Sequence, residues 1–262
     1  MVWNERQRRM LAVMGVRLWP QGEAQPESDS GIATTPVAPP PRAPAVAPVM
    51  AATMTAAVPS PSPAAGPTSS MDWTALRAAV SACTACSLCA SRTQTVFGIG
   101  HPQAHWMIVG EAPGEQEDLR GEPFVGKAGQ LLDNMLAAIG LSRQAADGDD
   151  PAQRVYIANV LKCRPPANRN PQPEEVARCA PFLQRQIELV QPKIILAMGR
   201  FAVASLLHSD EAIGRLRGRV HRVAGVPTIV SYHPAYLLRS PLDKAKAWDD
   251  LCLALETIGR TR

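Results

Sequence analysis

The sequence predicts an α/β protein with three layers, in which helices cover both faces of a central, mostly parallel four-stranded sheet. Four short apolar runs have the composition of buried strands, and helical patterns separate them from about residue 72 onward. Strands that alternate with helices form parallel sheets covered on both faces. A Pro/Ala-rich extension precedes this part of the chain, and we expect it to be disordered.

The predicted elements follow one another in a regular order. Asp72 is placed to cap a first helix that ends at Val80. A helix over 126–139 carries Leu and Met at helical spacing and stops at Gly140. Strands are expected at 106–109, 155–158, 194–197 and 226–230, and the other helices at 174–190, 201–207 and 242–258.

The chain divides into three regions. Residues 1–20 form a short amphipathic segment, either a docking element for a partner or a frayed terminus, and Arg17 and Trp19 interrupt its apolar run too early for a secretory signal. Residues 21–70 form a disordered linker, because Pro, Ala, Ser and Thr supply too little apolar surface to offset the ordering entropy. Residues 71–262 form the one folded domain.

Composition restricts the classes that remain. Six cysteines in 262 residues are too few for a disulfide scaffold, so we expect reduced thiols and a cytoplasmic protein. The formal net charge of +4 and the sequence pI near 8.8 permit nucleic-acid binding without demonstrating it.

Four cysteines lie in two groups that are far apart in the sequence. Cys83 and Cys86 form one pair, and Cys163 and Cys179 follow about eighty residues later. Four thiolates suit either a structural zinc or an iron-sulfur cube. Zinc ribbons usually close within about 20 residues, whereas here an α/β unit lies between the two groups.

The segments after the predicted strands carry candidate ligand-binding residues. Ligands of such sheets bind beyond the carboxyl ends of the strands. Phe124 offers an aromatic face, Asn159 both donates and accepts as the reading of a nucleobase edge requires, and His233 follows the fourth strand. Each alone has an ordinary structural explanation. Together they predict a pocket for a planar, polar base.

Several motifs in this order resemble a known family. They are Cys83-Thr-Ala-Cys86, Gly110-Glu-Ala-Pro-Gly114 with Glu117-Asp118, Pro123-Phe-Val-Gly-Lys-Ala-Gly129, Asn159 to Pro166 with Cys179, and His233-Pro-Ala-Tyr-Leu-Leu-Arg239. They resemble the motifs of the family 4 uracil-DNA glycosylases, iron-sulfur enzymes within the uracil-DNA glycosylase superfamily. The resemblance covers about residues 72–258.

The resemblance implies that a 4Fe-4S cluster is held by four of the six cysteines, namely Cys83, Cys86, Cys163 and Cys179. Cys163 and Cys179 lie 16 positions apart, as in that family. Cys89 and Cys252 are then ordinary cysteines. We expect the cluster to be structural and to pin the basic loop between Cys163 and Cys179.

The resemblance also implies how uracil is held. The uracil would be flipped out of the DNA, stacked on Phe124 and hydrogen-bonded at N3-H and O4 by Asn159. His233 would bind O2 and stabilise the departing anion. The backbone of Gly110, Glu111, Ala112 and Pro113 would contact the base, and Glu117 would shape the wall near C5, where a thymine methyl must be refused.

The residue that orients the water is a separate expectation. In the best-known glycosylase family an aspartate stands where this chain has Ala112, so the usual general base is absent. Glu111 is the nearest candidate, with Asp118 behind it. The acceleration would then come mainly from stabilising the anion.

The expected DNA contacts lie outside the pocket. Basic residues in the loop after Cys163 and in the arginine-rich run 215–222 would meet phosphates, although that run also fits a solvated hairpin. One leucine would wedge into the space that the base leaves. The candidates are Lys162, Arg164, Arg169, Arg217, Leu237, Leu238 and Arg239.

The expected activity is hydrolysis of the N-glycosidic bond of uracil in single- or double-stranded DNA, which starts base-excision repair. Two alternatives are a zinc or iron-sulfur DNA-binding protein without turnover, and a relative that traps uracil-DNA covalently. The second uses a histidine in a basic loop, and this chain has none between Cys163 and Cys179. We expect a nucleoid-associated monomer without membrane contact, with a replication or repair protein docked on residues 1–20.

Overall fold

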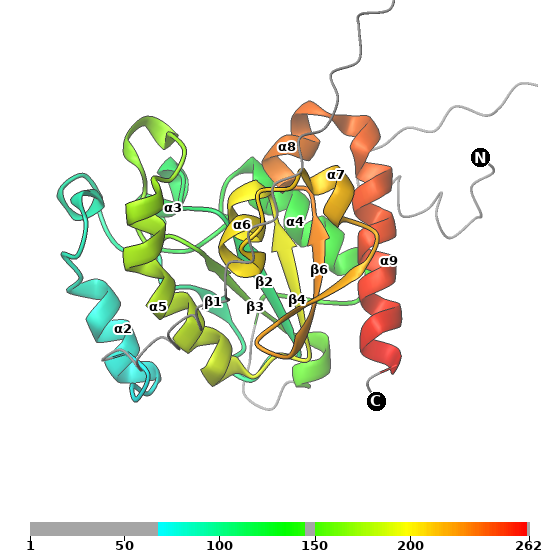
Figure 1. Cartoon of the computed structure of the whole chain (residues 1–262), viewed down its shortest axis with the longest axis horizontal. Coiled ribbons are helices and arrows are strands. Elements are labelled where there is room, and N and C mark those ends of the chain that lie inside the picture. Colours follow the sequence, from blue (N-terminus) through cyan, green and yellow to red (C-terminus); the bar gives the residue numbers. More distant parts are fainter. Residues whose placement is uncertain (1–67, 145–149, 261–262) are drawn as a thin grey trace, which may run out of the picture. The chain divides into compact units, whose positions relative to one another are not determined.

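A computed structural model describes residues 68–144 and 150–260 of the chain (Figure 1). The predicted amphipathic segment 1–20, and all but the last three residues of the predicted linker 21–70, lie outside the described residues. No helix in the described ranges is both long and apolar enough to cross a membrane.

The centre of the fold is a six-stranded sheet with the order β1-β3-β2-β4-β6-β5. The four inner strands run parallel, as predicted, and are β2 (Trp106–Gly110), β3 (Val155–Asn159), β4 (Ile194–Met198) and β6 (Val226–Ser231). The two edge strands, β1 (Ile99–Gly100) and β5 (Val220–Val223), are antiparallel to their neighbours. The sequence did not predict them, because β1 has two residues and β5 lies in the arginine-rich run.

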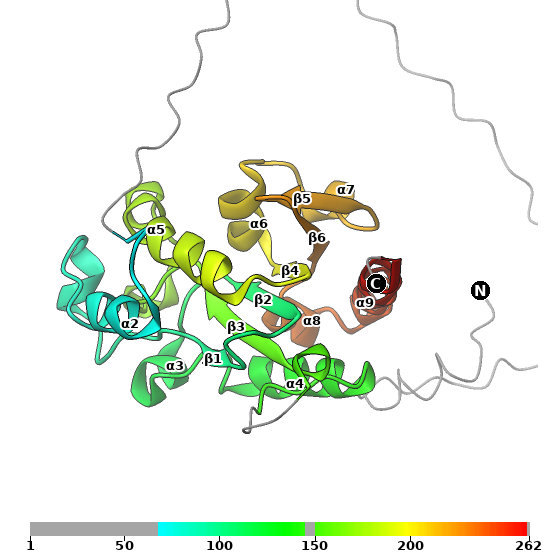
Figure 2. The same cartoon turned by 90° about the horizontal axis from the view of Figure 1, so that it is seen from below.

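Helices cover both faces of this sheet (Figure 2). The longer ones are α2 (Trp73–Ser81), α4 (Lys127–Ala138), α5 (Pro173–Val190), α6 (Arg200–Leu207) and α9 (Lys244–Arg260). The short ones are α3 (Glu115–Arg120), α7 (Ile213–Leu216) and α8 (Pro234–Arg239), with 3-10 turns η1 (Ser87–Ala90), η2 (Pro151–Gln153), η3 (Pro166–Asn168) and η4 (Pro241–Asp243). Every predicted long helix is present, whereas α3, α7 and α8 were not predicted.

The hydrophobic clusters on the two faces of the sheet follow the two-residue period of the strands. Trp106 and Ile108 of β2 face α4, α8 and α9, whereas Met107 and Val109 face α5 and α6. All five residues of β2 are buried, as is typical of a strand covered on both sides. The three-layer arrangement is therefore the one that the sequence predicts.

Local signals explain where the helices begin. The Asp72 carboxylate accepts a hydrogen bond from the Ala75 backbone N at 2.8 Å and caps α2 as predicted. Helix α8 begins with a residue of the candidate site, since Nδ1 of His233 accepts from the Ala235 backbone N.

The parallel register brings the carboxyl ends of the inner strands together. Gly110, the last residue of β2, lies directly opposite Asn159, the last residue of β3. Ser231 ends β6 two residues before His233. The segments singled out from the sequence therefore meet at one edge of the sheet.

Candidate active site

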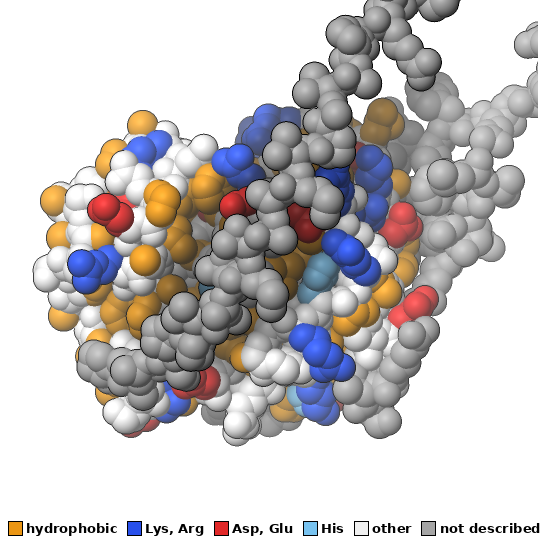
Figure 3. Space-filling view, in the orientation of Figure 1, with side chains coloured by type: hydrophobic (Ala, Val, Ile, Leu, Met, Phe, Trp, Pro, Cys, Tyr) orange, Lys and Arg blue, Asp and Glu red, His pale blue; other side chains and the backbone are white. Residues whose placement is uncertain are grey.

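A cleft of about 850 Å³ opens at this edge of the sheet. Residues that follow β2, β3, β4 and β6 line it, among them Glu111, Ala112, Pro113, Glu117, Phe124, Asn159, Arg200, His233 and Arg239. Lys and Arg side chains gather toward the upper and right-hand parts of the face seen in Figure 3.

Asn159 lines the cleft and has an unused hydrogen-bond acceptor. The residue is 2% exposed, and its side-chain Oδ1 is buried without a partner among the described residues. A buried polar atom that lacks a partner costs roughly 1–3 kcal/mol, so such an atom calls for an explanation. A bound ligand with an N–H donor would satisfy it.

Two glycines allow the groups of the cleft to approach one another. A Cβ at Gly110 would lie 2.4 Å from Asn159 Oδ1 and 2.6 Å from Phe124 Cζ, so glycine is required there. A Cβ at Gly129 would lie 1.7 Å from the Phe124 carbonyl oxygen. Phe124 itself has a φ of 56°, in the left-handed region that bulky residues rarely adopt. The backbone around Phe124 is thus tightly confined by its neighbours.

His233 lies beside Phe124 and is neutral. The two rings stack with centroids 5.3 Å apart and an interplanar angle of 27°. Burial lowers the pKa of His233 to about 4; the charge of Arg239 lowers it further and that of Glu117 opposes this. Since Nδ1 accepts from the Ala235 N–H at 3.2 Å, the single proton of the neutral ring is on Nε2. His233 can therefore donate a hydrogen bond without carrying a positive charge.

The two glutamates of the cleft differ in their surroundings. Glu117 joins two loops, because Oε2 accepts from the Gly114 N–H at 3.1 Å and Oε1 from the Val125 N–H at 2.9 Å. Burial raises the pKa of Glu111, and the charge of Arg200 opposes the rise. Glu111 is thus the carboxyl group of the cleft with room to act on a proton or a water.

Asp118 does not join this group. It is 3% exposed, and both of its carboxylate oxygens accept from the Thr93 backbone N at 3.0 Å. It does not line the cleft. We therefore assign Asp118 a structural role, which corrects its placement among the catalytic candidates.

Three of the expected DNA contacts are turned inward. Lys162 is 1% exposed and Leu237 is 0% exposed, so neither reaches the surface. Burial lowers the pKa of Lys162 to about 8. Arg217 lies 2.9 Å from the buried carboxylate of Asp250 and also donates to the Lys246 carbonyl. These three assignments are corrected: the residues support the fold.

The remaining DNA candidates stay at the surface. Leu238 is 43% exposed and Arg239 is exposed at the rim of the cleft. Arg164 donates to Asn168 Oδ1 at 2.8 Å, and Arg169 forms a short ion pair with Glu175. Both arginines are therefore partly engaged within their own loop.

Arg200 was not anticipated, although a signal for it exists. It follows Gly199 directly after β4, and both residues line the cleft. Gly199 has a φ of +91°, and a Cβ there would lie 3.0 Å from His233 Cβ. The rule that ligands bind beyond strand ends applies to β4 as much as to its neighbours.

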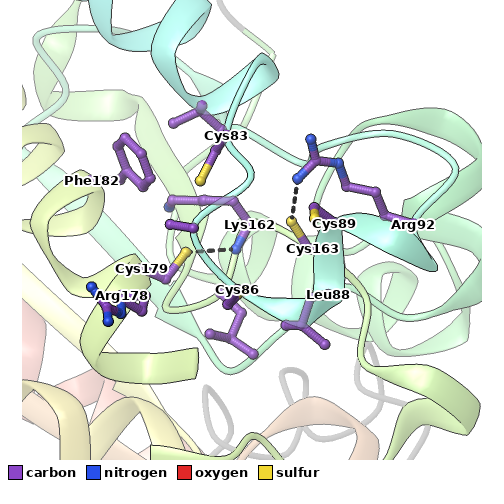
Figure 4. A pocket seen from close by; sticks show the side chains of 13 residues that line it. Cys83, Cys86, Leu88, Cys89, Arg92, Lys162, Cys163, Arg178, Cys179 and Phe182 are labelled. Carbon is purple, nitrogen blue, oxygen red and sulfur yellow. Dashed lines mark hydrogen bonds between the residues drawn. The ribbon is translucent and has the colours of Figure 1, made fainter. Parts of the chain in front are cut away.

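The predicted cysteine ligands converge on a second pocket (Figure 4). Cys83, Cys86, Cys163 and Cys179 all line it, and so does Cys89, whereas Cys252 does not. The Arg92 guanidinium donates to Cys163 Sγ at 3.1 Å, and the Lys162 backbone N–H donates to Cys179 Sγ at 3.3 Å. The sequence analysis did not single out Arg92.

The charged side chains other than cysteine that line this pocket are all basic among the described residues. The lining includes Arg92, Lys162 and Arg178 but no carboxylate. Burial raises the pKa of Cys179 to about 11 and also raises that of Cys163. In the part of the chain that the structure describes, no three His, Cys, Asp or Glu side chains are arranged to enclose a single metal ion.

Comparisons with known proteins agree with this geometry. The sequence model of the family described as the Uracil DNA glycosylase superfamily matches residues 97–252. A type-4 uracil-DNA glycosylase of Archaeoglobus fulgidus is 45% identical over 170 residues, which are 62% of this chain and 81% of the relative. The type-4 enzyme of Thermotoga maritima is 43% identical over 62% of this chain and 80% of the relative. That of Pyrobaculum aerophilum is 40% identical over 70% of this chain and 93% of the relative.

Proposed function

Because the chain belongs to the uracil DNA glycosylase superfamily and to its type-4 enzymes, we propose that the cleft hydrolyses the N-glycosidic bond of uracil in DNA. The enzyme excises uracil and starts base-excision repair. The observation that carries the assignment of this cleft is the unpaired Oδ1 of Asn159, because the N3–H of uracil is a donor suited to it.

Recognition begins with a base that has left the helix stack. Phe124 and His233 form the aromatic wall of the cleft, and Asn159 faces the edge of the base. Cytosine has an acceptor at N3 instead of the donor, so Oδ1 would stay unpaired against it. Sites built to satisfy a hydrogen bond reject analogues that lack it by about 10⁴–10⁵.

Bond cleavage leaves negative charge on the uracil and oxocarbenium character on the sugar. The Nε2–H of neutral His233 is available to donate to O2 as this charge develops. A water adds to the sugar, and Glu111 orients it from the same cleft. The water supplies the hydroxyl of the abasic sugar, and its proton balances the charge of the released base.

The activity is tested with a uracil-containing single strand and the matched duplex. We expect alkali-labile abasic sites with both, and none with cytosine or thymine at the same position. Binding without cleavage would support the alternative of a DNA-binding protein, and an adduct that survives denaturation would support covalent trapping. Either result overturns the proposed function.

Replacing Glu111 with Gln is expected to slow single-turnover excision by about 10²-fold, the lower range of general acid-base effects. The reason is that the amide is neutral and orients the attacking water less well. The substitution keeps the size of the side chain, so DNA affinity serves as the control. Undiminished cleavage would remove Glu111 from this role.

The pH profile separates Glu111 from His233. Burial raises the pKa of Glu111. As the pH falls, Glu111 therefore takes up a proton, and loses its active carboxylate form, at a higher pH than an ordinary glutamate. His233 protonates only near pH 4. We expect the single-turnover rate of the wild type to fall on the acid side as Glu111 takes up a proton, and the rate of the Glu111→Gln enzyme to fall only as the pH approaches 4. An inflection near 6.5 that persists in this variant would contradict the neutral histidine.

We further propose that Cys83, Cys86, Cys163 and Cys179 hold a 4Fe-4S cluster. Four thiolates carry more negative charge than the cluster core neutralises, and the cationic lining without a carboxylate suits an anionic group. The N–H groups of Arg92 and Lys162 that donate to the sulfurs of Cys163 and Cys179 also suit thiolate acceptors. A bound cluster would join the segment before β1 to the segment after β3 and would leave the chemistry to the cleft.

Leu238 is proposed as the wedge that fills the space left by the base. Leu238→Ala is expected to weaken excision from duplex DNA about tenfold more than from single strands, because only a duplex has a stack to close. Steady-state kcat/KM on both substrates measures this difference. Equal losses on both substrates would assign Leu238 to general DNA contact.

We propose that residues 1–20 dock on a replication or repair protein, that the enzyme acts as a monomer and that it associates with the nucleoid. A chain that begins at residue 68 should keep its excision activity and lose this docking.

A further inference from the structure

Lys162 connects the base-reading residue to the cysteine site. Its ammonium Nζ donates to the Asn159 backbone oxygen at 2.7 Å and to Gln186 Oε1 at 2.6 Å. Its own backbone N–H donates to Cys179 Sγ at 3.3 Å. Lys162 therefore contacts both Asn159, the proposed base-reading residue, and Cys179, a proposed cluster ligand.

The second anchor of the ammonium is rigid. Gln186 is 0% exposed, and its Nε2 donates to the Phe97 carbonyl at 2.8 Å and to the Tyr156 hydroxyl at 3.0 Å. Because the oxygen and the nitrogen of its side-chain amide are both hydrogen-bonded, Gln186 has little freedom to move with the side chain of Lys162. A change at Lys162 is therefore transmitted to the Asn159 backbone.

The same segment is tied to the first loop of the cleft. The Val160 N–H donates to the Gly110 carbonyl at 3.0 Å, and the Leu161 N–H donates to the Glu111 carbonyl at 3.1 Å. These bonds fix Asn159 relative to Gly110, against which its side chain packs. Lys162 adds a further hydrogen bond to the Asn159 backbone from the side of the cysteine pocket.

A counter-charge for the buried ammonium would lie on the sulfur side when the cysteines hold a cluster. Both of its hydrogen-bond acceptors are neutral, and the described lining of the cysteine pocket has no carboxylate. A buried cation needs compensation, and the thiolates of a loaded cysteine site would supply it.

We propose that Lys162 is a positioning residue that holds Asn159 in register with the uracil edge. This inference rests on the proposed function and deepens it.

The test is a double-mutant cycle of Lys162→Met with Asn159→Ala, read by single-turnover excision, KM and bound iron. We expect K162M to keep its iron and to lose about 10- to 100-fold in single-turnover rate, since small misplacements cost up to about 10²-fold. In the N159A background, the same change should cost less than about twofold. The matched control is K193M, which removes an exposed lysine at the start of β4 and should match the wild type.

Other outcomes overturn the inference in distinguishable ways. A full K162M loss in the N159A background would show that the lysine acts on the fold in general, and an undiminished K162M would show that it does not position Asn159. A wild-type enzyme that leaves uracil in place would instead defeat the proposed function. Should K162M fail to fold, K162Q, whose side chain is polar but one atom shorter and uncharged, replaces it in the same cycle.

Discussion

A His233→Ala enzyme is expected to excise uracil about 10²- to 10³-fold more slowly in single turnover, the usual loss when one donor to a developing anion is removed. The imidazole is neutral, its proton is on Nε2, and its ring lies against Phe124 in the cleft. Removing it takes away a hydrogen bond that gains strength as charge moves onto the base. DNA affinity should change far less than the rate, because this bond matters most in the transition state.

The substitution also removes the cap of α8, so a second variant is needed. His233→Asn keeps a side-chain acceptor for the Ala235 N–H and loses the imidazole. We expect H233N to unfold at the same temperature as the wild type, whereas H233A loses about 1 kcal/mol of stability. Rates within threefold of wild type in both variants would show that another group stabilises the leaving base.

Cys163→Ser is expected to give a colourless protein with little bound iron and a melting temperature lower by about 10 °C or more. Cys163 is buried, and its sulfur meets Arg92 within the cationic pocket. Without a bound group of opposite charge, Arg92, Lys162 and Arg178 would repel one another there. Binding free energy at a structural metal site is folding free energy, so its loss appears directly as lost stability.

Cys89→Ser is the matched comparison because this cysteine lines the same pocket. If Cys83, Cys86, Cys163 and Cys179 are the ligands, C89S keeps its iron and its melting temperature. If C89S lost its iron while a serine variant of one of the other four cysteines kept it, the proposed ligand set would be wrong. Full stability and activity in iron-free C163S would contradict the structural role of the cluster.

The sequence predicted that Phe124, Asn159 and His233 meet at one cleft, and this has a physical reason. Phe124, Asn159 and His233 follow apolar strands, and the carboxyl ends of parallel strands must meet at one edge. Their convergence depends only on the strand order and direction. The cysteine group was found because its residue type and spacing carry the chemistry without detailed geometry.

The errors concern residues whose partners are distant in the sequence. Asp118 is fixed by Thr93, and Arg217 by Asp250 of α9, and neither pairing has a local signal. The segment after His233 was not predicted to be helical, but it forms α8, and the helical phase buries Leu237 and exposes Leu238. Which of two adjacent leucines faces solvent follows from that phase alone.

The convergence of the cysteines also has a consequence for the unfolded chain. A group bound by both Cys86 and Cys163 closes a loop of 77 positions, much as a disulfide does. The chain-entropy relation for such cross-links gives about 4.5 kcal/mol for a loop of this length. An assembled cluster would therefore act as a topological constraint that lowers the entropy of the denatured ensemble, in addition to any contact it makes in the native state.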